Sequence, residues 1–478
     1  MTKQRSGINA RLLGLGLILI LLISAYATPL SASEAFMLQL QPELPSAWAA
    51  VDVFMAESAY ELGDELTYSA YQAALTELQF MPVLADLAEM SEALGLAETS
   101  DDPIAIIVTD GFVTRGAVLS ALCETMGGDP GAGAEDAAVW FVERGLMSGR
   151  ASGDYALDNP CTVEEMLVFA VRSYEYMVYE AGLDSRGFFW EVTGEGNSVY
   201  LLGSIHVSDG SMYPMSKAIT TAFGSSDFLA VEADIFGITV FDTMTILQKG
   251  VIPAESGMTI KDYISAETYE LYTLVFDAFG FEPDAFDYMK PWLAGMMLQN
   301  LNETYSEAEA ELGVDMYFLR KAYAADLDII ELEGLAFQCD VFDSFSPELQ
   351  EFQLLSALIG LIPEVIADDS GSISDESDMR NYARDSYLYL LDIVRTGDEE
   401  ALSMVLALDA IPDDPLEIEY NEVFLVNRNK GMAEKISVFL SEGAIQGDYF
   451  VVVGAAHMLG DDGIVALLTD MGYSVERR

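Results

Sequence analysis

Cysteine, histidine and cationic side chains are scarce in this chain of 478 residues. It holds three cysteines and two histidines, and its 22 Lys and Arg stand against 79 Asp and Glu, a formal net charge of −57. No spacing of the cysteines resembles a zinc site. A surface this acidic repels nucleic acid and anionic lipid, so we expect no nucleic-acid partner. We interpret the acidity as adaptation to a salty or alkaline exterior.

The three cysteines leave two interpretations open. Cys123 and Cys161 lie in the N-terminal part, and an oxidising compartment would allow a disulfide between them. Three unpaired core thiols, with Cys339 as the third, are the alternative.

The first residues are typical of a secretory signal, which we assign to residues 1–32. Lys3, Arg5 and Arg11 flank the start of an apolar stretch from Leu12 to Ala27, and small residues follow it. This stretch is shorter than the roughly 20 residues that span a bilayer, and an uncleaved membrane anchor is the alternative. We therefore expect a secreted or cell-surface protein.

The next part of the chain predicts helices. Residues 33–107 form a helical region of unknown role, which Pro82 is expected to divide. In residues 108–185, Thr114 and Thr162 stand where helix N-caps are expected.

A Trp-containing helix around Trp140 and a Gly-Leu-Met-Ser-Gly turn at residues 145–149 separate these two caps. The segment resembles the S-layer homology module, which usually docks on cell-wall polymer in sets of three. About one module and the opening of a second are visible. Cell-wall polymer is therefore one expected partner, and a helical prodomain that packs on the C-terminal domain is the alternative.

The pattern changes to strand at Phe188. Two β-like runs, Phe188–Val192 and Val199–Leu202, flank a glycine-rich turn at residues 194–197 and predict a hairpin. With 51% apolar residues the chain can fill more than one core, so we place a second domain at 186–478.

Both histidines follow a β-like run as Gly-x-x-His, in Leu201–His206 and in Val451–His457. A strand that ends in glycine turns sharply, and open α/β sheets place their sites at the carboxyl ends of strands. A third run, Asp227–Asp234, brings Glu232 to the same edge if it lies beside the first strand. Two imidazoles and one carboxylate form a metal set with an open position. Without a metal, Glu232 would act as a general base.

These segments resemble the TraB/GumN family, which includes the TIKI proteases and is related to the erythromycin esterase and ChaN group. The resemblance begins at Trp190–Glu232 and covers some 290 residues. Further similar segments follow in family order: Lys290–Leu293, Gly313–Leu319, Leu332–Gly334 with Gln338, Val426–Ile436 and Val453–His457.

The resemblance implies an α/β fold with a central sheet flanked by helices and paired strand–Gly-x-x-His–helix units, behind a mainly helical N-terminal region. It implies that His206, Glu232 and His457 hold a divalent metal ion, which we expect to be zinc, manganese or cobalt. Glu232 and Arg428 are the expected catalytic residues, because a guanidinium stabilises a developing oxyanion.

Three further residues match family positions. Asn429 is expected to support the site, and Asp315 and Glu333 are expected to be structural. We expect residues 366–378, which are acidic and rich in serine, to form a mobile loop.

The leading prediction is a metal-dependent hydrolase, most plausibly a peptidase, with a peptide or small-molecule substrate. One alternative is a haem- or ligand-binding protein without turnover, as in ChaN relatives. The other is a wall-attached interaction protein in which residues 108–180 matter most.

Overall fold

The computed structural model describes most of the chain beyond the predicted signal. The segments that it describes are residues 44–63, 70–96, 108–109, 111–129, 131, 133–148, 154–194, 196–282, 284–305, 309–370, 376–408 and 414–478. Residues 1–32 lie outside them, so the signal remains a prediction. Across the described segments, no helix is long and apolar enough to cross a membrane.

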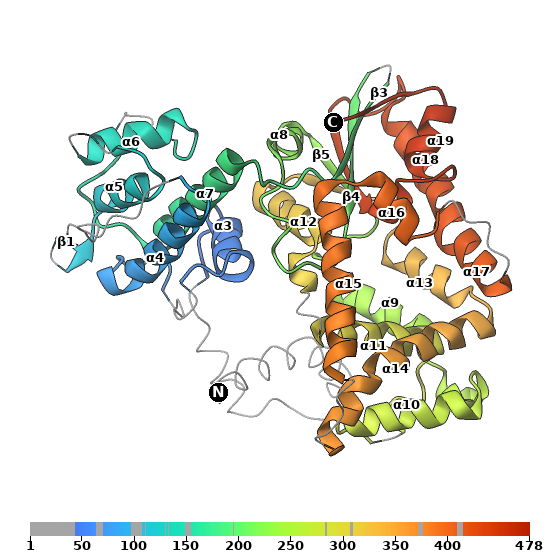
Figure 1. Cartoon of the computed structure of the whole chain (residues 1–478). Coiled ribbons are helices and arrows are strands. Elements are labelled where there is room, and N and C mark those ends of the chain that lie inside the picture. Colours follow the sequence, from blue (N-terminus) through green and yellow to red (C-terminus); the bar gives the residue numbers. More distant parts are fainter. Residues whose placement is uncertain are drawn as a thin grey trace.

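Residues 44–185, called here the helical region, form a group of helices at one end of the molecule (Figure 1). Its elements are α3 (Ala50–Phe54), a π-helix (Met55–Ala59), α4 (Glu77–Ala93), β1 (Val108–Thr109), β2 (Phe112–Val113), α5 (Arg115–Thr125), α6 (Ala134–Glu143) and α7 (Val163–Ala181).

Both predicted caps are present. The Thr114 hydroxyl accepts from the Ala117 N–H at the start of α5, and Thr162 caps α7 in a capping box with Glu165. The two helix starts are also joined, because Arg115 and Glu165 form an ion pair of 2.5 Å.

The expectation that Pro82 divides a helix is wrong. Proline removes one backbone hydrogen bond from α4, yet the helix continues from Glu77 to Ala93. Its buried face, which includes Phe80, Val83 and Leu87, holds the helix on the region's core and offsets that loss.

The thiols of Cys123, Cys161 and Cys339 are free and buried, so the three-thiol alternative describes this structure and the disulfide does not.

Residues 186–478, predicted above as a second domain and called the second domain below, are built on a six-stranded sheet in the order β6-β5-β7-β4-β3-β8. The predicted hairpin is confirmed, since β3 (Phe188–Thr193) pairs antiparallel with β4 (Ser198–Ser204). The strands β4, β7 (Tyr449–Gly454), β5 (Phe228–Val231) and β6 (Asp328–Glu331) run parallel, and β8 (Ser474–Arg477) closes the other edge. The placement of β5 beside β4 is wrong, because β7 lies between them.

Helices cover both faces of this sheet, as β7 shows. Phe450 contacts Phe318 of α12 (Val314–Ala325) on one face, and Tyr449 stacks on Phe439 of α18 (Asn427–Phe439) on the other. The near-continuous apolar run of β7 is therefore that of a strand buried on both sides. The expected α/β architecture is confirmed.

The remaining helices surround the sheet or pack into a separate apolar cluster beneath it, around α10, α11 and α14 (Figure 1). They are α8 (Lys217–Ser225), α9 (Val240–Gly250), α10 (Ala266–Ala278), α11 (Pro291–Tyr305), α13 (Leu335–Asp343), α14 (Pro347–Ser370), α15 (Glu376–Thr396), α16 (Glu399–Val405), α17 (Pro415–Tyr420) and α19 (Ile464–Asp470). The expected loop at 366–378 is partly wrong, because α14 continues to Ser370 and α15 begins at Glu376. Residues 371–375 lie outside the described segments.

Candidate functional site

Four ionisable side chains lie at the carboxyl ends of four parallel strands, at one edge of the sheet. His206 follows β4, His457 follows β7, and Glu232 and Glu333 follow β5 and β6. The register aligns these ends, with Ser204 opposite Gly454 and Val231 opposite Val452. The structure thus brings together the three predicted metal ligands.

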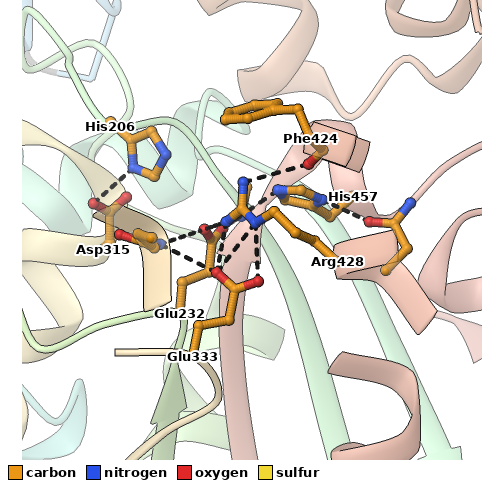
Figure 2. Close-up of polar contacts among 10 residues, drawn as sticks. His206, Glu232, Asp315, Glu333, Phe424, Arg428 and His457 are labelled. Atoms are coloured by element: carbon orange, nitrogen blue, oxygen red, sulfur yellow. Dashed lines mark hydrogen bonds and ion pairs between the residues drawn. The ribbon is translucent and has the colours of Figure 1, made fainter. Parts of the chain in front are cut away.

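Arg428 lies between two carboxylates in this cluster (Figure 2). Its Nη2 is 2.5 Å from Glu232 Oε2 and 2.7 Å from Glu333 Oε2, and its Nε donates to Glu333 Oε1 at 2.9 Å. The three side chains are between 4% and 10% exposed. Nη1 lies 3.5 Å from the carbonyl oxygen of Phe424. Among the described residues, no carboxylate accepts a hydrogen bond from Nη1. Arg428 therefore orients Glu232 through Nη2, and Nη1 is the part of its guanidinium outside these ion pairs.

Glu232 is held as an ionised carboxylate. Its Oε1 accepts from the Gly454 N–H at 2.7 Å, and the Gln338 amide donates to Oε2 at 3.2 Å. Burial opposes ionisation, but the charges of His457, His206 and Arg428, together with the Gly454 N–H, lower the pKa of Glu232 to about 2. At neutral pH, where His457 is uncharged, the attraction comes from His206 and Arg428.

His457 is a neutral imidazole of defined tautomer. Asn429 donates through Nδ2 to the Asp462 carbonyl oxygen, so its Oδ1 accepts from His457 Nδ1 at 2.6 Å. The His457 Nε2 lone pair is then free, 3.9 Å from Glu232 Oε1. Burial lowers the pKa of His457 to about 4.

His206 is also held at Nδ1, but by a carboxylate, and unlike His457 it is charged at neutral pH. Its Nδ1 is 3.0 Å from Asp315 Oδ2, at the start of α12. The Asp315 charge raises the pKa of His206 to about 10. Because the His206 side chain is 66% exposed, water screens this attraction, and its energetic value is that of a surface ion pair.

Gly454 leaves the space that these groups share. A Cβ at this position would stand 3.4 Å from Glu232 Oε1, 3.5 Å from His457 Cδ2 and 4.0 Å from His206 Nε2. As the side chains stand, no three His, Cys, Asp or Glu residues of the described segments are close enough to hold a metal ion. The donor chemistry does fit one: two imidazole Nε2 atoms and a carboxylate oxygen face one space, and each Nδ1 is already held by an oxygen acceptor.

Structural roles were expected for Asp315 and Glu333, and the structure shows which side chains they hold. Asp315 holds His206 and Glu333 holds Arg428. Each lies in a segment that resembles the family, but its local sequence does not indicate which side chain it holds. The π-helix at Asn421–Val426, which precedes Arg428 and presents Phe424, had no sequence signal that we could identify.

Comparisons with known proteins find a family and two relatives. Residues 188–477 match the TraB/PrgY/gumN family. YbaP of Escherichia coli strain K12, a protein named as uncharacterized, is 27% identical over 165 residues, which cover 34% of this chain and 59% of YbaP. YbaP of Shigella flexneri has the same identity and coverage. The chain therefore spans less than two thirds of the curated relatives it matches, and no solved structure matches it. Since the matched segment includes the whole sheet and every residue of the cluster described above, the chain belongs to the TraB/PrgY/gumN family.

Proposed function

We propose that this protein is a metal-dependent hydrolase of the peptidase class, whose ion is held by His206, Glu232 and His457. The observation that carries the proposal is the pairing of the two histidines. Each imidazole donates from Nδ1 to an oxygen acceptor, Asp315 or Asn429, which directs Nε2 toward a ligand. Metal binding would displace the proton on His206 Nε2. Metal-binding histidines in proteins are held in this way.

The charge balance of the cluster also favours a cation. Glu232, Glu333 and Asp315 supply three negative charges, whereas Arg428 supplies one positive charge and His457 is neutral. Even with His206 protonated, the carboxylates are in excess. Buried carboxylates need compensation, and a divalent ion supplies it.

Each residue then has a defined task. Zinc, manganese or cobalt, when bound, supplies activation of water and polarisation of a carbonyl group. Arg428 and the Gly454 N–H keep Glu232 ionised and fix the direction of Oε1. Glu333 holds the guanidinium in place, and Nη1 of Arg428 is directed at charge that develops on the substrate.

Peptide digestion followed by mass spectrometry tests the proposal. The purified full chain is incubated with a mixed peptide library and with zinc, manganese or cobalt in turn, beside Glu232→Gln and Glu476→Gln. Glu476 is a matched control because it is exposed, 65% by side chain, on the edge strand away from the site.

Cleavage that requires added metal, disappears in Glu232→Gln and persists in Glu476→Gln supports the proposal. If the chelator-treated Glu232→Gln variant cleaves peptides as fast as the unaltered chain with added metal, the proposal is contradicted. Metal binding without cleavage of any peptide would favour the ligand-binding alternative.

A further inference from the structure

The helical region contacts the second domain on the helix that carries Asp315. Arg320, five residues further along α12, places its guanidinium 3.9 Å over the ring of Phe54 in α3. The same guanidinium lies 5.2 Å from the ring of Phe236, which follows Glu232 by four residues. One partly buried side chain thus joins the helical region, α12 and the segment after β5.

A half-buried charged cluster lies at this contact. Lys321, the next residue of α12, interacts electrostatically with Glu175 of α7 and with Asp52 of α3. Glu175 also accepts from the Tyr60 hydroxyl at 3.2 Å, and Asp52 pairs with Arg172 at 3.5 Å. These partnered charges, together with the Arg320 contact on Phe54, join α12 to α3 and α7.

The segment that follows His206, residues 207–216, is held by the same region. Gly210 has a φ of +90°, and a Cβ there would meet the carbonyl oxygen of Ala59 at 2.5 Å. The Tyr179 hydroxyl donates to the Met215 carbonyl oxygen at 2.9 Å, and the Ser185 N–H donates to the Pro214 carbonyl oxygen at 3.0 Å. Residues 207–216 therefore lie against both the start and the end of the helical region.

These two contacts meet at the candidate site. Tyr213, within residues 207–216, donates its hydroxyl to the carbonyl oxygens of Leu312 and Gly313 at 2.8 and 3.1 Å. That is where α12 begins, and Asp315 in its first turn holds His206. The segment after His206 and the start of α12 are thus locked together.

The other half of the site is supported differently. Arg428 holds Glu232 and Glu333, and His457 Nε2 lies 3.9 Å from Glu232 Oε1. Their further support comes from Gly454, Gln338 and Asn429, and all of these residues belong to the second domain.

We propose that the helical region is a positioning module of the site: it holds the His206–Asp315 pair in place against the half that contains Glu232, Arg428 and His457. This role lies inside the molecule and is separate from the predicted docking on cell-wall polymer. The inference rests on the proposed function for what the pair does, but the contacts themselves do not depend on the reaction.

Histidine NMR of the full chain tests the proposal. Because the chain holds two histidines, ring-labelled protein gives one signal from each half of the site. Gly210→Ala pushes residues 207–216 away from Ala59, and its control is Gly472→Ala, where φ is +94° and no atom lies within 4 Å of the added Cβ. Gly472→Ala therefore carries a similar strain from its positive φ but lacks a steric contact like that of Gly210→Ala with Ala59.

Arg320→Ala loosens α12 independently, with Arg395→Ala as its control, because the Arg395 side chain pairs with its neighbour Asp392 on α15. We expect the His206 signal to shift or broaden in Gly210→Ala and in Arg320→Ala, the His457 signal to stay in place, and neither signal to change in the controls.

An unmoved His206 signal in the folded variants would overturn the proposal, as would equal movement of both signals in variants and controls. The selective His206 shift in a chain without hydrolase activity would refute the proposed function and leave this inference standing.

Discussion

Replacement of Gly454 by alanine should change metal binding at the site while leaving the stability of the fold almost unaltered. Gly454 has φ −49° and ψ 136°, which alanine adopts freely, and its N–H still donates to Glu232 in the variant. The added Cβ meets its nearest side-chain atoms at 3.4 to 4.0 Å, which is ordinary van der Waals contact. We expect the free energy of unfolding to change by less than about 1 kcal/mol, because no cavity, clash or unpaired polar group arises.

The effect on binding should be far larger. The methyl group would stand among Glu232 Oε1, His457 and His206 Nε2, in the space where the proposal needs an ion. Ligand bonds to zinc are about 2.0–2.2 Å long, so the three donors must close on that space and the methyl group prevents it. We expect loss of stoichiometric metal binding.

Isothermal titration with zinc or manganese, beside urea denaturation, measures the two effects on the same protein. Gly431→Ala is the matched control, since Gly431 lies inside α18 with no atom within 4 Å of an added Cβ. The reasoning is refuted if Gly454→Ala binds one equivalent of metal with the affinity of the unaltered chain.

Three other predictions concern the contacts that hold the cluster. Arg428→Met removes the guanidinium that pairs with the buried carboxylates of Glu232 and Glu333, and we expect a loss of about 3–5 kcal/mol in urea unfolding at neutral pH. Asn429→Ala removes the acceptor that fixes His457, and metal affinity measured by titration should fall roughly 10- to 100-fold. The third prediction concerns pH. Because the folded-state pKa of Glu232 is about 2, below the ordinary 4.5, its contribution is complete above pH 4.5 and is lost as the pH falls toward 2. In Glu232→Gln, the free energy of unfolding should therefore fall less between pH 4.5 and pH 2 than in the unaltered chain, by up to about 3 kcal/mol, as measured by denaturation across that range.

An exposed ion pair is the control for the stability measurements. Arg395 and Asp392 pair at 2.7 Å with side chains 30% and 59% exposed, so Arg395→Met should cost under about 1 kcal/mol. Equal losses in Arg428→Met and Arg395→Met would contradict the view that burial makes the Arg428 contacts strong. An unchanged metal affinity in Asn429→Ala would contradict the role given to Asn429. An unchanged loss of stability between pH 4.5 and pH 2 in Glu232→Gln would contradict the role given to Glu232.

Much of the site could be predicted because its residues stand at strand ends. Apolar runs that end in Gly-x-x-His indicate parallel strands, and the carboxyl ends of parallel strands meet at one edge. This is why His206, His457 and Glu232 were placed together although β5 was given the wrong neighbour. Strand order depends on long-range pairing, which the local pattern of a strand does not encode.

The supporting residues were harder to predict for a physical reason. Asp315 reaches His206 from the first turn of α12, and Glu333 reaches Arg428 from the end of β6. Among 79 acidic residues, nothing in local sequence distinguishes a carboxylate that holds a ligand from one that faces water. The same holds for Arg320, whose position between Phe54 and Phe236 exists only once two domains are packed.

Elemental analysis of bound metal tests the central claim most directly. The full chain and its His206→Ala/His457→Ala variant are dialysed against a defined mixture of zinc, manganese and cobalt and then analysed side by side. The proposal predicts about one equivalent of metal in the unaltered chain and none in the variant, because both Nε2 donors are gone. The same metal content in the two proteins, or none in either, would contradict it.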